Sequence, residues 1–148
     1  HVGELIDHID GNTICEADHL FATRLWQNNS KVHFDINARE DKKRLIYGGH
    51  IISLVRALSF NGLENAQLIV GINGGTHANP VFAEDTIYCW SEVLDKIDLN
   101  VRNIAALRLR SVGTKEKNHN MRLKSDDGKY LPTIVLDFDY WVLVPKEL

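Results

Sequence analysis

One stretch of the chain has apolar side chains on nearly every side of a helical wheel. Residues 51–60, with the sequence IISLVRALSF, carry this pattern. A helix that is apolar all round needs cover on all sides, because no polar face is left for water. Gly48 and Gly49 precede the stretch, and Asn61-Gly62 is a typical C-terminal stop. The sequence therefore predicts one central, buried helix.

The remainder of the chain is rich in strand patterns and has no second long apolar helix. Most of these segments alternate between apolar and polar side chains, as expected for strands with one covered face, whereas residues 67–73 form a continuous apolar run typical of a buried strand. We expect an α+β fold in which an antiparallel sheet wraps around the central helix. The predicted strands are 4–10 (an edge strand closed by a turn at 11–12), 67–73, 85–94, 104–114 and 133–144, with a long connection over 115–130 that turns at 127–128.

A shorter helix is expected before the central one. Thr13 and Glu16 have the spacing of a capping box, and Cys15 is the alternative cap. The polar run at 27–30 would end this helix. Its predicted apolar face consists of Ala17, Leu20, Phe21 and Leu25.

Size and charge exclude several classes of protein. The 148 residues favour a single domain over 1–148. A net charge of −3 argues against a general nucleic-acid binder. No apolar run approaches the roughly 18 residues that span a bilayer, and the first residues do not resemble a signal peptide, so we expect a cytoplasmic protein with neither a membrane nor a nucleic acid as partner. The chain begins at His1 rather than Met, which leaves open that it is part of a longer polypeptide.

The two cysteines carry no chemistry in this interpretation. Cys15 and Cys89 lack the spacing of metal ligands, and two cysteines do not make a disulfide framework. We expect buried thiols and no metal site.

One constellation suggests catalysis. Asn28 and His33 lie five residues apart, just before the glycine-led central helix. An imidazole acts as general base or acid near neutral pH, and a side-chain amide can hold a water or a carbonyl. Free N–H groups around Gly48 and Gly49 could stabilise a developing enolate oxygen. Together these groups suit the addition of water to a double bond beside a thioester, although a structural histidine is the alternative for His33.

Three stretches resemble the MaoC-like hydratase and dehydratase family. Residues 27–35, QNNSKVHFD, are similar to its hydration motif G-D-x-N-P-hydrophobic-H-x-D. Residues 44–50, RLIYGGH, are similar to R-I-V-H-G-M-L, and residues 79–86, NPVFAEDT, to P-V-x-x-G-D-T. The resemblance implies the hot-dog fold and activity on acyl-CoA thioesters. It covers nearly the whole chain and is strongest to the C-terminal half of members with two tandem hot-dog halves, which act on mesaconyl-CoA or β-methylmalyl-CoA.

The resemblance also assigns roles to individual residues. His33 matches the catalytic histidine of the family, and Gly48 takes the position whose N–H faces the thioester carbonyl. Asn28 stands where the family usually has an aspartate, and an amide cannot take a proton. Asn28 would therefore position water or substrate, while His33 serves as the main general base. Asp35 would be an orienting or assisting carboxylate, or else a surface residue or strand-edge cap.

The implied C5 dicarboxylic acyl group carries a free carboxylate, which needs a cationic partner. Arg56 on the central helix and His77 in the glycine-rich break are the candidates, although Arg56 can instead reach the surface. Tyr47 would line the acyl pocket or pack in the core. The reaction needs no metal and no cofactor, because CoA is part of the substrate.

The sequence leaves two alternative functions open, and it also predicts an oligomeric state. A non-catalytic hot-dog half could bind acyl-CoA or support a partner domain, and a thioesterase could use the same fold. A thioesterase would need a carboxylate on the central helix, and residues 51–60 contain none. Because such sheets have exposed edges, we expect a homodimer or a higher oligomer of dimers.

Overall fold

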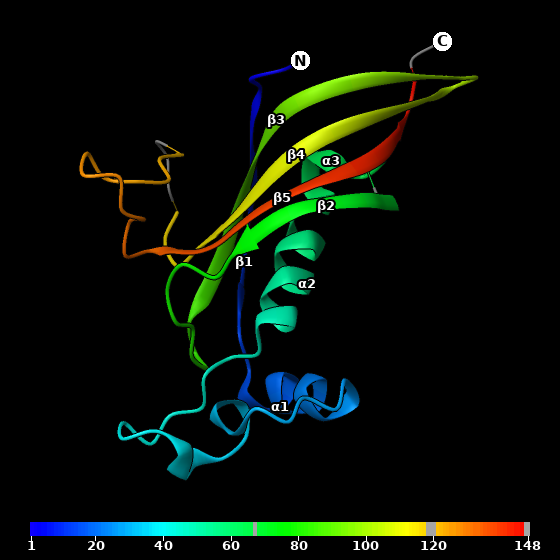
Figure 1. Ribbon diagram of the computed structural model, residues 1–148. Coiled ribbons are helices and arrows are strands. Elements are labelled where there is room, and N and C mark those ends of the chain that lie inside the picture. The colour runs from blue at the N-terminus through cyan, green and yellow to red at the C-terminus, as the bar shows by residue number, and fades with distance from the viewer. Residues whose placement is uncertain (67, 118–120, 147–148) are drawn as a thin grey trace.

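The computed structural model describes residues 1–66, 68–117 and 121–146. Five strands form one antiparallel sheet in the order β1-β3-β4-β5-β2, and helix α2 lies against it (Figure 1). This is the predicted α+β hot-dog architecture, so the expected fold class is confirmed. The elements are β1 (Leu5–Thr13), α1 (Glu16–Leu25), η1 (Lys31–His33), η2 (Ile36–Ala38), α2 (Gly48–Leu58), α3 (Phe60–Leu63), β2 (Leu68–Thr76), β3 (Thr86–Val101), β4 (Ile104–Thr114) and β5 (Ile134–Pro145).

Helix α2 is covered by the sheet on one side. Ile51 and Val55 are buried against it, and α2 contacts β1, β3, β4 and β5. The approach is close because β4 offers a glycine: a Cβ on Gly113 would lie 2.8 Å from the Val55 side chain. Ser53 and Ala57 on the opposite side are exposed. The expectation that the whole helix surface is covered is therefore wrong for this chain, because one sheet can cover only one face of a helix.

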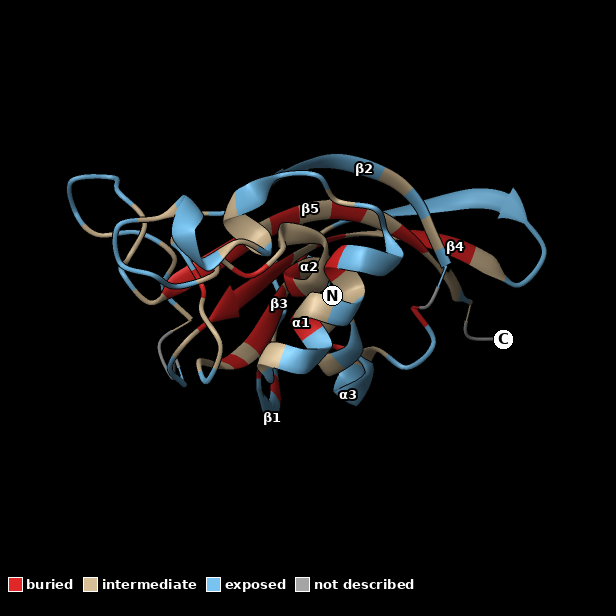
Figure 2. Cartoon of the chain, turned by 90° about the horizontal axis from the view of Figure 1, so that it is seen from below, coloured by how far each residue is buried: buried red, intermediate tan, exposed pale blue. Residues whose placement is uncertain are grey.

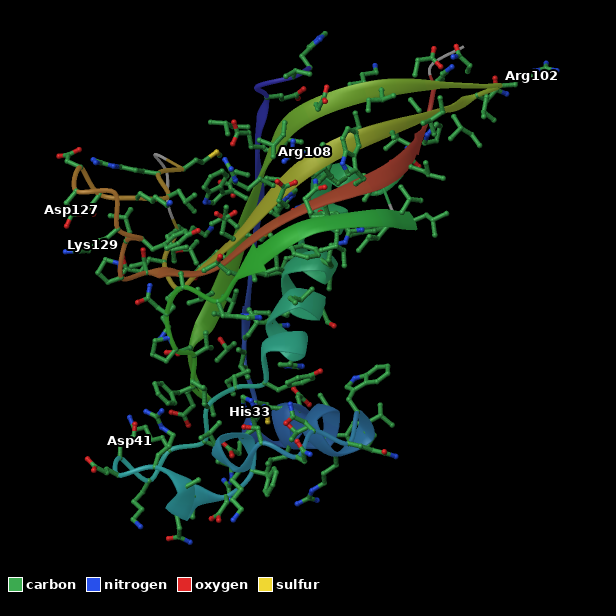
Figure 3. All side chains as sticks on the ribbon, in the orientation of Figure 1. His33, Asp41, Arg102, Arg108, Asp127 and Lys129 are labelled. Carbon is green, nitrogen blue, oxygen red and sulfur yellow. The ribbon has the colours of Figure 1, made fainter. Side chains whose placement is uncertain are left out.

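The three strands in the middle of the sheet agree best with the sequence pattern. Strand β4 has the predicted bounds, and β3 begins one residue later than expected but extends to Val101. The β3–β4 hairpin reaches beyond the core and turns near Arg102 (Figures 1 and 3). In β5 the predicted inward positions are all buried: Ile134, Leu136, Phe138, Tyr140 and Val142.

Both edge strands differ from the prediction. Strand β1 is an edge strand as expected, but it continues through Gly11 to Thr13, and the predicted turn is a register shift between Asp7 and Gly11. Strand β2 was expected to be buried and is instead the other edge, mostly exposed in Figure 2. It pairs with β5 alone, so an apolar run in the sequence did not mean two covered faces. Gln67 of the predicted strand lies outside the described residues.

Helix α1 lies where the sequence predicted it, but the prediction of which face is buried is wrong. Its N-cap is Cys15, the alternative cap, and Thr13 belongs to β1. His19 and Thr23 are buried, whereas Phe21 is 70% exposed and Leu25 is also exposed. The reason is that α1 lies away from the sheet (Figure 1) and packs its polar side against the segment around His33 through hydrogen bonds.

The predictions for the two cysteines and for the 115–130 connection are confirmed only in part. Cys89 is buried as expected, but Cys15 is exposed. The turn at 127–128 is confirmed by a 2.8 Å hydrogen bond from the Ser125 N–H to the Lys129 carbonyl, while 118–120 of this connection lie outside the described residues. None of the helices in the described ranges has the length and apolarity needed to cross a membrane.

Candidate functional site

A cavity of about 360 Å³ at the N-terminal end of α2 brings together three of the predicted site residues: His33, Gly48 and His77. Besides His33, its walls come from residues 45–51 and 77–81, and a 2.9 Å hydrogen bond from the Ile46 N–H to the Val81 carbonyl holds these two segments side by side. The rest of the lining is mainly apolar and consists of Leu45, Ile46, Ile51, Ala78, Asn79, Pro80 and Val81. A mostly apolar cavity with a few polar groups is typical of a small-molecule site.

The tautomer of His33 follows from its hydrogen bond. Its Nδ1 lies 2.8 Å from the Leu45 carbonyl oxygen. A carbonyl only accepts, so Nδ1 carries the proton and the neutral ring keeps a lone pair on Nε2. Among the described residues Nε2 has no hydrogen-bond partner. An imidazole in this state at a cavity wall is equipped to take a proton from a bound water.

A second histidine, which sequence analysis did not single out, holds this arrangement in place. The Nε2 of His19 donates to the His33 carbonyl over 2.8 Å, and its Nδ1 accepts from the Tyr47 N–H over 3.2 Å. Burial lowers the pKa of His19, which favours the neutral ring that these two bonds require. His19 thus connects α1, the His33 segment and the start of α2. The only hint in the sequence was its spacing of four from Thr23, a second polar residue on the same helix face.

The glycine pair makes room for two aromatic rings. A Cβ on Gly48 would lie 2.6 Å from His77 Nε2, and a Cβ on Gly49 would lie 2.6 Å from the Tyr47 ring. The Tyr47 ring meets the His33 ring edge to face, with centroids 5.9 Å apart. Gly48 and Gly49 also begin α2, so their N–H groups have no acceptor within the helix. This end of α2 can therefore stabilise a negative oxygen.

His77 lines the cavity and is also exposed to solvent. Burial lowers its pKa, which favours the neutral form. The role of His77 as a cationic partner of the substrate carboxylate stays a prediction.

Asn28 and Asp35 lie in turns and do not line the cavity. The Asn28 Oδ1 accepts from the Ser30 N–H over 2.9 Å, and the Asp35 Oδ1 accepts from the Asn37 N–H over 2.9 Å, which caps η2. Both side chains therefore stabilise local backbone in this structure.

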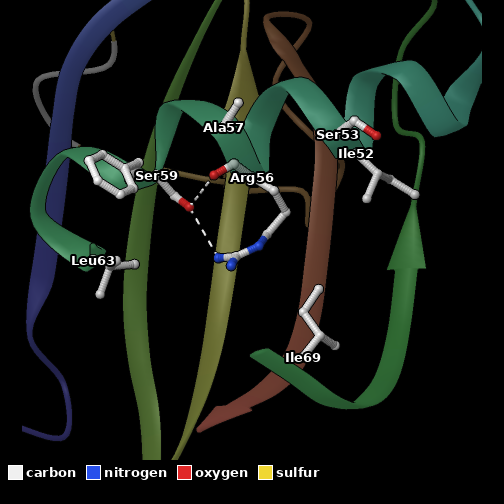
Figure 4. Close-up of a pocket in the computed structure, with 8 residues that line it drawn as sticks. Ile52, Ser53, Arg56, Ala57, Ser59, Leu63 and Ile69 are labelled. Carbon is white, nitrogen blue, oxygen red and sulfur yellow. Dashed lines mark hydrogen bonds between the residues drawn. The ribbon is translucent and has the colours of Figure 1, made fainter. Parts of the chain in front are cut away.

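Arg56 lines a different cavity, of about 540 Å³, at the C-terminal end of α2 (Figure 4). Its guanidinium donates to Ser59 Oγ at 3.1 Å, to the Tyr140 hydroxyl at 2.9 Å and to the Ala66 carbonyl at 2.7 Å. The structure thus does not bring Arg56 together with His33, and the side chain is held within the fold rather than reaching out to solvent.

From Arg56 a row of buried hydrogen bonds crosses the sheet. The Tyr140 hydroxyl contacts Ser111 Oγ, Ser111 contacts Ser91 Oγ, and Ser91 contacts His8 Nε2, each at 2.8 Å. His8 Nδ1 donates to the Asn61 carbonyl at 2.5 Å, so a neutral His8 accepts from Ser91. Every hydroxyl then donates in the direction from Arg56 to His8. Burial lowers the pKa of His8, which keeps this order.

Known proteins resemble the chain closely. It is 59% identical over 145 residues to a mesaconyl-CoA hydratase of Cereibacter sphaeroides, covering 98% of this chain and 42% of that protein. It is 53% identical over 150 residues to a β-methylmalyl-CoA dehydratase of Chloroflexus aurantiacus, covering 98% of this chain and 43% of that protein. The chain therefore spans less than half the length of these curated relatives. No family model matches it.

A solved structure supports the same relationship. A MaoC domain protein dehydratase from Chloroflexus aurantiacus superposes with a TM-score of 0.95 at 52% identity, over 100% of this chain and 44% of that chain. The sequence resemblance to MaoC-like proteins is thereby confirmed.

Proposed function

We propose that this chain, which belongs to the MaoC-like hot-dog family, catalyses the reversible hydration of an α,β-unsaturated acyl-CoA thioester. Mesaconyl-CoA, with β-methylmalyl-CoA as its hydrated product, is the first substrate pair to test, because the two curated relatives carry these names. The observation that carries the proposal is the His33 ring, whose Nε2 has no partner among the described residues and which lines a cavity that also contains Gly48.

The proposed reaction uses one imidazole for both proton transfers. His33 Nε2 takes a proton from water as the hydroxyl oxygen bonds to the β-carbon. The electron pair of the double bond moves toward the thioester oxygen, where the Gly48 N–H stabilises the enolate. The imidazolium then returns the proton to the α-carbon. Dehydration follows the same steps in reverse.

Asn28 and Asp35 support this site indirectly in our proposal. Each holds a turn next to η1, the element that carries His33. A water or substrate contact by the Asn28 amide remains our proposal from the family motif, and it would require the Asn28 side chain to leave the Ser30 N–H.

A non-catalytic half domain is the second candidate. It is favoured by the amide at Asn28, which cannot take a proton from water. In that case the cavity would bind acyl-CoA, or the domain would support a partner, without turnover. A thioesterase is less favoured, because α2 has no carboxylate between residues 51 and 58 to activate a water.

We further propose that the domain forms dimers through β2. This strand pairs with β5 on one side, and its outward side chains Leu68, Val70 and Ile72 are exposed. An unpaired edge is a template for another strand, and antiparallel pairing of β2 with β2 of a second copy would be self-complementary.

The deciding experiment mixes the protein with mesaconyl-CoA or crotonyl-CoA and follows the loss of enoyl absorbance. His33→Ala should abolish turnover and leave the circular dichroism spectrum unchanged. His50→Ala serves as the control, because His50 lies on α2 and does not line the cavity. Near-normal turnover of His33→Ala would remove His33 from the mechanism. Binding of acyl-CoA without turnover by the wild type would favour the half-domain function, and release of free thiol would identify a thioesterase.

A further inference from the structure

We propose that a cluster of basic side chains around Phe82 binds the phosphate groups at the nucleotide end of coenzyme A. The inference rests on the proposed function in that it assigns the other end of the same thioester substrate. We call Arg39, Lys43, Lys115 and Phe82 the Phe82 cluster.

Three cations gather at one aromatic ring. The Arg39 Cζ lies 5.5 Å from the Phe82 ring centroid, the Lys43 Nζ 5.6 Å and the Lys115 Nζ 5.8 Å. Each distance is within the range of a cation–π contact. The chain as a whole has a net charge of −3, so three cations around one ring are a local exception to its overall charge. Such a site suits a ligand with several negative charges.

The Phe82 cluster is continuous with the His33 cavity along two segments. Leu45 and Val81 line the cavity; Lys43 precedes Leu45 by two residues, and Phe82 directly follows Val81. The hydrogen bond between Ile46 and Val81 keeps the two segments adjacent. A ligand whose reactive end lies in the cavity can therefore extend its other end over the cluster.

Two of the three cations in the Phe82 cluster are paired with carboxylates of the described residues, and the third is not. Arg39 pairs with Asp41, and Lys115 pairs with Asp85, both at 2.7 Å. Lys43 Nζ has no carboxylate within ion-pair distance among the described residues. Arg39 donates to both carboxylate oxygens of Asp41, at 3.0 Å and 2.7 Å, so a phosphate beside Arg39 has to displace a bidentate partner, whereas Lys43 is available without any exchange.

Asp85 holds the loop that carries Phe82 in place. Its Oδ2 accepts from the Phe82 N–H at 2.8 Å and pairs with Lys115. This bond fixes the loop that presents the ring, which reduces the entropy lost on binding.

Coenzyme A carries a 3′-phosphate and a pyrophosphate at its adenosine end, separated from the thioester by the pantetheine arm. These groups match three converging cations, whereas the acyl end matches the mostly apolar cavity.

The test uses adenosine 3′,5′-bisphosphate, which has the 3′-phosphate of coenzyme A and one of its two 5′-phosphate groups but no thioester, and measures binding by calorimetry. Lys43→Ala should weaken binding about fivefold, and Lys43→Glu more than about tenfold. Lys42→Ala is the near control, because Lys42 Nζ bonds to Asn37 and not to Phe82. Lys129→Ala, on the exposed connection far along the chain, is the second control.

A second readout separates this subsite from the reaction. Lys43→Ala should raise the KM for the acyl-CoA and leave the KM for the matching acyl-pantetheine unchanged. Failure of the wild type to bind the bisphosphate, or equal weakening by Lys42→Ala, would overturn the assignment. Bisphosphate binding that depends on Lys43 in a protein without hydratase activity would support the subsite and refute the proposed function.

Discussion

The imidazole of His19 donates a hydrogen bond over 2.8 Å to the backbone carbonyl of His33, so a buried residue of α1 positions the ring that lines the cavity. The same imidazole accepts from the Tyr47 N–H at the start of α2. His19 is therefore a positioning residue: it holds the backbone of His33 against the start of α2.

Replacing His19 should reduce both stability and turnover. His19→Ala leaves the His33 carbonyl and the Tyr47 N–H without their partner, which should lower the free energy of unfolding by about 2 kcal/mol or more. We expect kcat for hydration to fall more than KM changes, because the His33 ring loses its orientation. Urea unfolding and steady-state kinetics check this. An unchanged kcat in a destabilised variant would limit His19 to a structural role.

Adding one methyl group at Gly48 should disturb the site without unfolding the domain. The new Cβ would lie 2.6 Å from His77 Nε2, so the ring must move and the cavity changes shape. We expect kcat/KM of Gly48→Ala to fall by about 100-fold, as is typical of a small misplacement at a reacting centre. Gly74→Ala is the matched control, because a Cβ at Gly74 would enter open space. Equal activity of the two variants would show that the close approach is not needed.

Breaking the buried row of hydroxyl groups should affect stability alone. Tyr140→Phe removes the link between Arg56 and Ser111 and should lower the free energy of unfolding by about 1–3 kcal/mol. Hydratase activity should persist, because Tyr140 does not line the His33 cavity. Tyr88→Phe, in the same sheet and only half-buried, provides the comparison in a thermal unfolding experiment. Two variants of equal stability would argue against a cooperative row.

Stability should decrease in mildly acidic solution. The pKa of His8 and that of His19 are lowered in the folded state by burial, from 6.5. The unfolded chain therefore binds protons at a higher pH than the folded chain, and the free energy of unfolding falls as the pH decreases below 6.5. The loss levels off below the lowered folded-state pKa values.

The size of this effect can be tested by urea unfolding at several pH values. Each histidine contributes a slope of up to about 1.4 kcal/mol per pH unit within that window. In His8→Gln the slope should be smaller by one such contribution, since glutamine does not titrate. A stability that stays constant as the solution is acidified through the ordinary histidine pKa would contradict the burial of these two rings.

Because β2 has an unpaired edge, we expect a substitution on this strand to disrupt the proposed dimer. Val70→Lys places a charge on the outermost strand and should shift the protein from dimer to monomer. Sedimentation or light scattering at micromolar concentration measures the change. Ile97→Lys is a control, because Ile97 is similarly exposed but lies on β3 inside the sheet order. A wild-type monomer would refute the dimer.

The sequence predicted most reliably where a strand has one covered face. In β5 the alternation of side chains was enough from Leu136 to Val142, where Leu136, Phe138, Tyr140 and Val142 are buried and the residues between them are only half-buried; at the start of the strand, Val135 is buried as well. In β2 the continuous apolar run was misleading, since a run of this kind does not reveal whether a strand lies inside the sheet or at its edge.

The site was predictable in part for a similar reason. His33 and Gly48 could be named from short motifs, because their spacing along the chain is local. His77 came from a separate segment, and only the fold shows that it lies against Gly48. His19 was not found, because its two partners are a carbonyl and an N–H of the backbone, which leave no mark in the sequence.

By itself the sequence determined the central helix, the α+β class, the middle strands of the sheet and the family. These depend on the order of apolar and polar residues and on motifs within about ten positions. Tertiary structure alone decided which face of α1 is buried, that Arg56 belongs to a row of hydrogen bonds away from His33, and that three cations meet at Phe82. The physical reason is that hydrogen bonds and charge contacts between distant segments depend on how those segments pack, and one-dimensional patterns do not contain that geometry.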